Sequence, residues 1–114
     1  MNTLKFKLIS NGVEQINEEA NYYIKDNKMN FKIKEDLFEY DLDNKYLIKK
    51  NKETSIKINL IDKVLEITLL SHNYTVDMEI IDLDINITEK NIKIEYTFDD
   101  GEKNTNCIFI SYWK

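Results

Sequence analysis

The sequence predicts an all-β protein: one antiparallel up-and-down barrel of about eight to ten short strands. Apolar and polar residues alternate in short runs along the whole chain, and turn-forming residues separate these runs at intervals of about eight to twelve residues. Alternation on a strand places one set of side chains on each face of a sheet, which fits a sheet with one buried and one wet face. Closure of the sheet removes its exposed edge strands. The 114 residues fit one domain, which we predict over residues 1–114.

Most of the predicted strands carry apolar residues at every second position. These apolar sets are, in chain order, Leu4/Phe6/Leu8, Phe31/Ile33, Phe38/Tyr40/Leu42, Ile56/Ile58/Leu60, Tyr74/Val76/Met78/Ile80, Leu83/Ile85/Ile87 and Ile92/Ile94/Tyr96/Phe98. Each set is expected on the buried face of its strand, with the intervening Lys, Glu, Asp, Asn and Thr residues in water.

Three segments have less regular patterns. Residues 13–24 fit a helical face as well as a strand, and the alternation of residues 19–24 favours the strand. Residues 64–70 can bury either Leu65, Ile67 and Leu69 or the opposite set, and the first choice leaves Glu66 and Thr68 in water. The segment Cys107–Ile110 is apolar on both faces, so one face is expected to meet a second layer, a plug or a partner.

Turn signals separate the runs. Asn and Asp favour tight turns because they tolerate a left-handed backbone and bond nearby amides. Asp100-Gly101 is interpreted as the strongest hairpin signal in the chain. The predicted turns are Asp26-Asn27-Lys28, Asp43-Asn44-Lys45, Asn51-Lys52-Glu53, Ile61-Asp62-Lys63, His72-Asn73, Glu89-Lys90-Asn91 and Asp99-Asp100-Gly101-Glu102.

Charge and composition argue against two classes of partner. The net charge is −5, and the densest basic stretch, Lys49-Lys50-Asn51-Lys52, reads as a solvated hairpin turn, so no nucleic-acid partner is predicted. No apolar run approaches the roughly 20 residues of a membrane helix, so no membrane partner is predicted. The start of the sequence has no signal-peptide pattern, and the lone Cys107 has no disulfide partner, so we expect a cytoplasmic protein.

Groups suited to nucleophilic catalysis are scarce. The single histidine, His72, follows Ser71 in a predicted turn, and an exposed turn histidine is the favoured interpretation. Cys107 lies within an apolar run, where a buried and inert thiol is favoured over a nucleophile. No catalytic residue is predicted, and the chain is interpreted as a non-enzymatic protein.

Carboxylates supply the remaining chemistry. Asp99-Asp100-Gly101-Glu102 lacks the ligand spacing of a calcium loop and is interpreted as an acidic hairpin tip. Paired carboxylates for hydrolysis are available at Glu18-Glu19 and along one face of the predicted strand at Glu39, Asp41 and Asp43, for which a solvated sheet face is the favoured interpretation. One Cys and one His cannot form a structural zinc site, so neither a metal nor a cofactor is predicted.

A tunnel enzyme that cleaves triphosphates is a further alternative. Such a barrel would point Glu66, Lys93 and Glu95 inward. These residues alternate with apolar groups that need burial, the chain has no Arg to grip phosphate with two hydrogen bonds, and its two glycines form no phosphate loop. The tunnel is therefore disfavoured.

Several segments, in order along the chain, resemble the YwiB-like family of small uncharacterised bacterial proteins. They are Glu19–Lys28, Lys63–Leu65, Tyr74, Met78–Ile80, Asn91–Tyr96 and Asn106–Tyr112. The resemblance implies a calycin-like, lipocalin-related β-barrel. The family has no agreed activity or site residues, so it implies no functional residue here.

Two functions stay open besides a less favoured carboxylate hydrolase. The first is binding of a small apolar or amphipathic ligand inside a barrel lined by Leu, Ile, Phe and Tyr, with a filled core as the alternative to a cavity. The second is interaction with a protein partner, or formation of a homodimer, through the outer surface. It is motivated by Cys107–Ile110, Tyr112 and Trp113. No ligand-binding residue is predicted.

Overall fold

The computed structural model describes residues 2–41, 43–99 and 101–113, which form strands and turns with no helix among them. Leu42 and Asp100, which belong to a predicted apolar set and a predicted turn, lie outside the described residues. The strands are β1 (Thr3–Ser10), β2 (Val13–Lys25), β3 (Lys28–Ile33), β4 (Asp36–Asp41), β5 (Tyr46–Lys50), β6 (Thr54–Asn59), β7 (Val64–Leu69), β8 (Tyr74–Thr88), β9 (Asn91–Asp99) and β10 (Asn104–Trp113).

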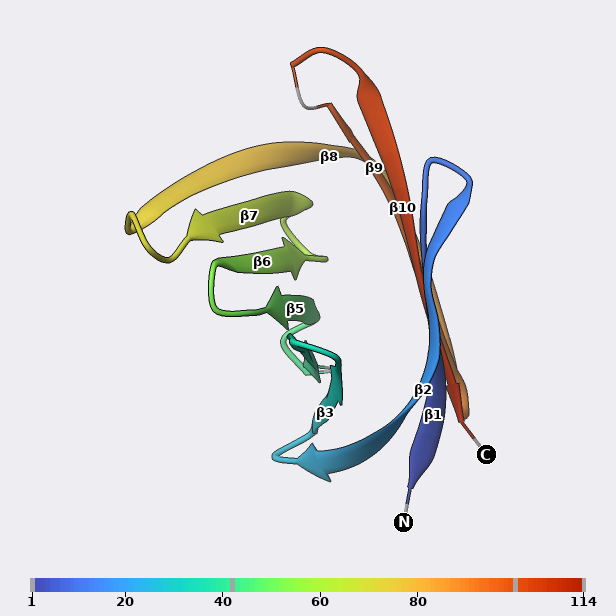
Figure 1. The fold of residues 1–114 in the computed structure, drawn as a ribbon. Coiled ribbons are helices and arrows are strands. Elements are labelled where there is room, and N and C mark those ends of the chain that lie inside the picture. The colour runs from blue at the N-terminus through green and yellow to red at the C-terminus, as the bar shows by residue number, and fades with distance from the viewer. Residues whose placement is uncertain (1, 42, 100, 114) are drawn as a thin grey trace. The chain divides into compact units, whose positions relative to one another are not determined.

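Every strand pairs antiparallel with its neighbours in the chain, and β1 also pairs with β10, so the strand order closes into a barrel (Figure 1). The predicted fold class is thus confirmed. Residues 13–24 form part of strand β2, so the strand is confirmed over the helix. No helix long and apolar enough to traverse a lipid bilayer occurs in the described part of the chain.

The chain divides into two compact units. The terminal unit comprises residues 1–21 and 80–114, and the central unit comprises Tyr22–Glu79. Strands β2 and β8 are the longest, with 13 and 15 residues, and each contributes residues to both units.

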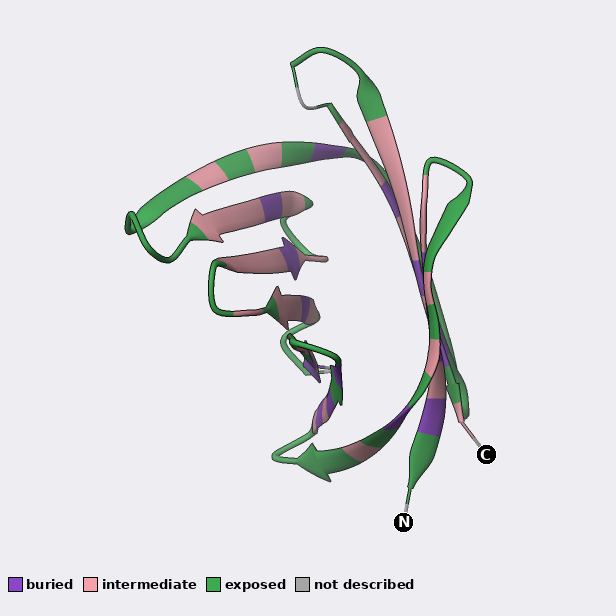
Figure 2. Cartoon of the chain, in the orientation of Figure 1, coloured by how far each residue is buried: buried purple, intermediate pink, exposed green. Residues whose placement is uncertain are grey.

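Aromatic and aliphatic residues from alternate positions form the core of the central unit. Phe31 and Phe38 pair across β3 and β4, and their rings stack with centroids 4.9 Å apart. Tyr40 meets the Phe31 ring edge-on at 5.7 Å. Leu47 and Ile58 continue the buried face across β5 and β6 (Figure 2). The predicted alternation therefore selects Phe31, Phe38, Tyr40 and Ile58 correctly, whereas Leu47 belonged to no predicted set.

The core of the terminal unit is built around Phe109 of β10. Its ring centroid lies 6.0 Å from that of Phe6 on β1 and 6.0 Å from that of Tyr96 on β9. Burial raises the pKa of the Tyr96 hydroxyl well above its ordinary range. Ser111, two residues beyond Phe109, is fully buried opposite Phe6 and Ile92.

Two tight turns have left-handed backbone at both of their central positions. Asp26 and Asn27 have φ values of 53° and 63° between β2 and β3. Asn11 and Gly12 have φ values of 50° and 80° between β1 and β2. Positive φ at both positions is typical of type I′ hairpins, which Asn-Gly favours strongly. The Asn11-Gly12 turn was nevertheless not among the predicted turns.

The two predicted runs ending at Ile80 and beginning at Leu83 form one strand, β8. Pairing with β9 shifts between Ile80 and Asp82, which leaves Ile81 as the extra residue of a bulge. The bulge explains the change of phase between the two apolar sets, from even to odd positions. The two apolar sets therefore lie on one continuous strand, in agreement with the absence of a predicted turn between them.

Candidate ligand-binding face

The buried apolar side chains of the central unit lie on one face of its sheet, which we call the inner face. Residues paired directly across antiparallel strands share a face, so the register orders this face into rows. The first row runs through Ile24, Met29, Tyr40, Leu47, Ile58, Leu65 and Met78. The second runs through Tyr22, Phe31, Phe38, Lys49, Ile56, Ile67 and Val76.

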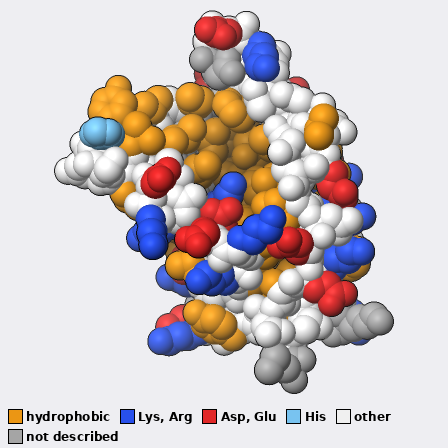
Figure 3. Space-filling view, viewed as in Figure 1, with side chains coloured by type: hydrophobic (Ala, Val, Ile, Leu, Met, Phe, Trp, Pro, Cys, Tyr) orange, Lys and Arg blue, Asp and Glu red, His pale blue; other side chains and the backbone are white. Residues whose placement is uncertain are grey.

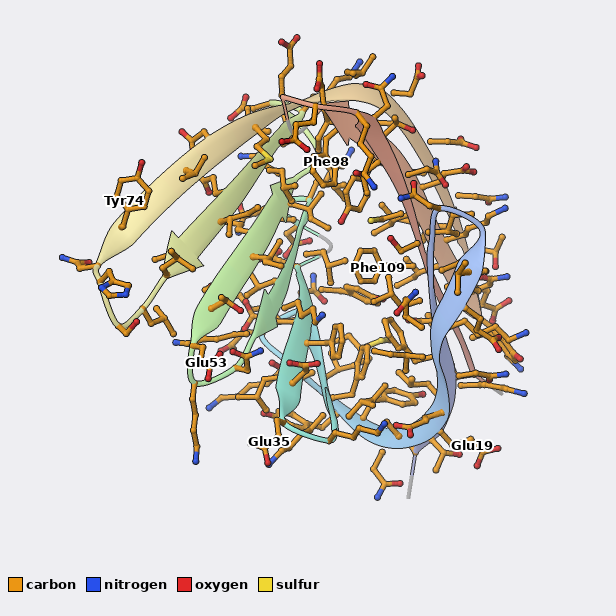
Figure 4. All side chains as sticks on the ribbon, turned by 45° about the horizontal axis from the view of Figure 1, so that its top comes forward. Glu19, Glu35, Glu53, Tyr74, Phe98 and Phe109 are labelled. Carbon is orange, nitrogen blue, oxygen red and sulfur yellow. The ribbon has the colours of Figure 1, made fainter. Side chains whose placement is uncertain are left out.

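Burial on the inner face decreases from its first row towards the β7–β8 hairpin. Leu47, Ile58 and Leu65 are buried, whereas Ile67 is only half-buried. At the hairpin, Leu69 is 39% exposed and its cross-strand partner Tyr74 is 58% exposed. Figure 3 shows hydrophobic side chains gathered beside the single histidine, and Figure 4 labels Tyr74 at the start of β8. The inner face therefore has an apolar floor and an accessible apolar rim.

One cation lies within the second row. Lys49 is opposite Phe38 on one side and Ile56 on the other, so its stem packs among apolar groups. Its Nζ atom lies 3.9 Å from Oδ2 of Asp36, and both side chains are partly exposed. At this distance and exposure the pair is weak, so the ammonium keeps donors for another acceptor.

Polar groups around Asp36 form the edge of the inner face. The side-chain amide of Asn51 donates to Asp36 Oδ1 at 3.0 Å. The Asn51 side-chain oxygen accepts the backbone N–H groups of Glu53 and Thr54, each at 2.9 Å. Asn51 thus closes the β5–β6 turn and holds Asp36 beside Lys49. An apolar surface with a few fixed polar groups at one edge is suited to an amphipathic molecule.

The predicted basic stretch at residues 49–52 is not a solvated turn throughout. Lys49 belongs to the inner face of β5, and Lys50 is exposed on the opposite face. Asn51 uses its side chain to close the turn. The solvated-turn interpretation is therefore wrong for Lys49, because strand alternation separates it from its neighbour.

The carboxylates at positions 39, 41 and 43 have three different environments. Glu39 accepts a hydrogen bond from the Tyr46 hydroxyl at 3.1 Å. Asp41 is buried, which corrects the prediction that this face is simply solvated. Asp43 is exposed and accepts the side-chain amide of Asn27 at 2.9 Å. Glu39 and Asp41 share the Tyr46 hydroxyl and Lys28 as polar neighbours, whereas Asp43 binds the turn at Asn27.

Asp41 is buried because it closes the turn after β4. Its Oδ1 atom accepts the backbone N–H groups of Asp43 at 3.0 Å and Asn44 at 2.9 Å, and its Oδ2 atom accepts the Asn44 side-chain amide at 3.0 Å. These hydrogen bonds, led by the Asn44 backbone N–H, hold the pKa of Asp41 below its ordinary value of 3.8. The Nζ atom of Lys28 lies 4.0 Å from Oδ2.

We expect Asp41→Asn to reduce the acid sensitivity of folding. A lowered pKa in the folded state stabilises the protein above the unfolded value of about 3.8, and this contribution is lost as pH falls through the folded pKa. The difference in free energy of unfolding between wild type and Asp41→Asn should thus be constant near neutral pH. It should shrink as the pH falls below about 3.8. Urea unfolding from pH 7 to pH 2 measures it, with Asn44→Ala as an intermediate case. A difference in free energy of unfolding that does not change with pH would contradict the lowered pKa of Asp41.

The two residues considered for nucleophilic chemistry have separate surroundings. His72 is exposed in the β7–β8 turn, where its backbone N–H donates to Leu69 at 3.2 Å. Cys107 of β10 is only half-buried, which corrects the prediction of full burial. It lies opposite Tyr96 of β9. The interactions described for His72 and Cys107 include no acid–base partner of the kind that a catalytic triad needs.

The other carboxylates considered for hydrolysis or calcium binding lie apart from one another on their strands and turns. Glu18 is half-buried opposite Phe6, whereas Glu19 is exposed opposite Lys5, so the two point to opposite faces of β2. Asp99 accepts the backbone N–H of Gly101 at 2.8 Å, as an acidic hairpin tip would. Within residues 2–41, 43–99 and 101–113, no three His, Cys, Asp or Glu residues are grouped so that they could hold a metal ion.

The residues of the disfavoured triphosphate tunnel lie on the outer face of their strands. Glu66 alternates with the inner-face residues Leu65 and Ile67 of β7. Lys93 and Glu95 alternate with buried Ile92 and Ile94 of β9. The inward arrangement that a phosphate tunnel needs is absent at these three positions.

Comparison with known proteins returns one structural likeness. No family model matches the chain, and no curated protein matches it. The fold is similar to the crystal structure of the YwiB protein from Bacillus subtilis, at 12% sequence identity and a TM-score of 0.47, over 99% of this chain and 91% of that one.

Proposed function

We propose that this protein is a non-enzymatic carrier or sensor of a small amphipathic molecule, bound on the inner face of the central unit. The observation that carries the proposal is a gradient of burial along one apolar face with Lys49 set into it. The apolar body of the ligand packs on Ile56, Ile67 and Val76. Its acidic head group accepts a hydrogen bond from the Lys49 ammonium.

The surroundings of the histidine and of the Glu18-Glu19 pair support a non-enzymatic role. His72 is exposed in a turn, and the Glu18 and Glu19 carboxylates point to opposite faces. General acid–base catalysis needs two such groups near one reacting atom. The half-buried Cys107 supports a reducing, cytoplasmic location, because an unpaired thiol persists there.

Membership of the YwiB-like family, with a calycin-type barrel, is part of the proposal. Its support is the order of strand motifs in the sequence, from Glu19–Lys28 to Asn106–Tyr112. The family assignment adds no site residue, so ligand binding depends on the inner face alone.

Binding of decanoate tests the proposed head-group contact. We expect wild-type protein to bind decanoate in isothermal titration calorimetry, and Lys49→Met to bind it about tenfold more weakly, because one charge-assisted hydrogen bond is lost. Lys50→Met is the matched control, since Lys50 is adjacent in sequence and exposed on the other face. It should leave the affinity unchanged.

Decanol and a variant of the apolar floor complete the test. Decanol carries no charge, so Lys49→Met should bind it as well as wild type does. Ile67→Glu should abolish binding of both ligands, because it places a carboxylate in the apolar surface; circular dichroism checks that it folds. Equal losses in the two lysine variants, or no binding of either ligand by the wild type at millimolar concentration, would overturn the proposal.

A second candidate function is protein interaction through the outer surface of β1 and β10. The observation that favours it is the position of Ile108 and Ile110. Both are half-buried on the face of β10 opposite Phe109 and Ser111. The two-sided apolar segment predicted from the sequence therefore keeps one partly exposed face.

A further inference from the structure

The outer face of the terminal unit carries an apolar stripe along β10. Ile108, Ile110 and Tyr112 alternate with the inner-face residues of this strand. Ile9 of β1 lies directly opposite Ile108 and widens the stripe. Tyr112 is 37% exposed, and the three isoleucines are half-buried. The stripe is thus a contiguous apolar surface that this unit leaves in contact with solvent.

Charges of opposite sign flank the two ends of this stripe. Lys5 lies opposite Tyr112, and Lys7 and Lys93 lie on either side of Ile110. At the other end, Glu95 lies opposite Ile108, and Asp84 lies beside Glu95 on β8. Glu19 of β2 lies opposite Lys5, so lysines outnumber carboxylates towards Tyr112, and the outer face is net basic there and acidic towards Ile108.

The outer face is hollowed at both ends of the stripe. A hollow of about 350 Å³ at the basic end is lined by residues that include Lys5, Glu19 and Tyr112. A hollow of about 240 Å³ at the acidic end is lined by Asp82, Leu83, Asp84, Glu95, Thr97 and Asn106. Each hollow is open to solvent, so a side chain from another molecule has access to both.

We propose that this face binds a second copy of the chain about a two-fold axis. The axis lies in the interface and crosses β10 between Ile108 and Ile110, so the two β10 strands run antiparallel across it. This rotation brings the basic end of each copy onto the acidic end of the other, which makes the face complementary to itself. A partner whose surface carries charges of one sign only would be attracted to one end of the stripe and repelled by the other end.

The rotation assigns specific contacts. The apolar stripes pack on each other, with Ile110 of each copy against Ile108 of the other. Lys93 of each copy meets Glu95 of the other, because these residues flank the axis two positions apart on β9. Tyr112 of each copy lies over the acidic hollow of the other, where Asp84 and Asn106 offer acceptors to its hydroxyl.

Charge reversal at positions 93 and 95 tests this arrangement. We expect the wild type to show a concentration-dependent monomer–dimer equilibrium in sedimentation velocity. Lys93→Glu or Glu95→Lys alone should weaken the dimer by at least about tenfold, because each places like charges together twice per dimer. The double variant restores opposite charges across the axis and should recover most of the affinity. Lys32→Glu, an exposed charge reversal in the central unit, is the matched control and should have no effect.

Ile110→Asp supplies an independent variant, and it should abolish the dimer while circular dichroism reports a folded protein. A wild type that is monomeric at millimolar concentration overturns the proposal. A dimer that is insensitive to both single charge reversals, or one that the double variant fails to recover, also overturns it. This inference deepens the second candidate function and is independent of ligand binding. A monomer that still binds decanoate would remove the dimer and leave the first candidate intact.

Discussion

Phe38→Ala is expected to lower the free energy of unfolding by about 3–5 kcal/mol, the usual cost of removing a buried aromatic ring. Phe38 is 1% exposed, and its ring stacks on Phe31 with 7° between the ring planes. Removal of the ring leaves a cavity beside Phe31 and loses the stacking contact as well. Urea unfolding followed by tryptophan fluorescence and by circular dichroism measures the change.

Leu37→Ala is the matched control for this variant. Leu37 is adjacent in β4 but is 52% exposed on the opposite face, so its truncation should change stability by no more than about 0.5 kcal/mol. Similar losses at positions 37 and 38 would mean that the register of β4 is wrong. The comparison thus tests the face assignment on which the ligand-binding proposal depends.

Ser111→Asp is expected to be the most damaging single change, with a loss of roughly 4 kcal/mol or more at neutral pH. Ser111 is 0% exposed between Phe6 on β1 and Ile92 on β9. A carboxylate there has no cation opposite it in either neighbouring strand. Burial raises the pKa of the introduced carboxyl, so mild acidification should recover part of the loss.

Ser55→Asp is the control, because Ser55 lies on the outer face of β6 opposite Lys50. It should be tolerated and should show no recovery of stability on acidification. If Ser111→Asp were as stable as Ser55→Asp at neutral pH, position 111 could not be a buried position of the terminal core. Thermal unfolding at pH 7 and pH 5 distinguishes the two outcomes.

Alternation predicted most of the strands because it reports a local property. Positions 56 and 58 are apolar because they lie on the buried face of their strand, so the buried face can be identified from the sequence itself. The same reasoning placed Leu65, Ile67 and Leu69 on the inner face of β7, and the pairing of Leu65 with buried Ile58 agrees. The segment 13–24 was decided correctly for the same reason.

Other features were missed although the sequence contained a signal. Asn11-Gly12 is a strong hairpin dipeptide, and its turn chemistry alone predicts the observed turn. The change of phase between Ile80 and Leu83 indicates a bulge as well as it indicates a turn. Ile81-Asp82, which separates the two runs, is not one of the Asn-Gly or Asp-Gly pairs that favour a two-residue hairpin, and this favours the bulge.

The candidate site itself was not predictable from local pattern. Lys49 looked like one of several lysines near a turn, and only its pairing with Phe38 and Ile56 places it on an apolar face. Asp41 looked like one solvated carboxylate among three, and only the path of the turn at Asp43 and Asn44 buries it. The position of Lys49 and the burial of Asp41 both depend on the path of the backbone beyond each residue.

The sequence by itself determined the antiparallel strands and the buried side of most of them, because side-chain period and burial are coupled residue by residue. It did not do so for β10, whose segment Cys107–Ile110 is apolar on both faces, or for the second half of β8, where Ile85 and Ile87 are exposed. The predicted up-and-down barrel already made consecutive strands neighbours, but the tertiary structure alone decided the register of each pair, including that of β1 with β10. It also decided which polar residues share a face with the core. Cross-strand pairing joins residues far apart in the chain, as Lys7 and Ile110 are, and no local pattern specifies such a pair. Both functional proposals rest on those pairings.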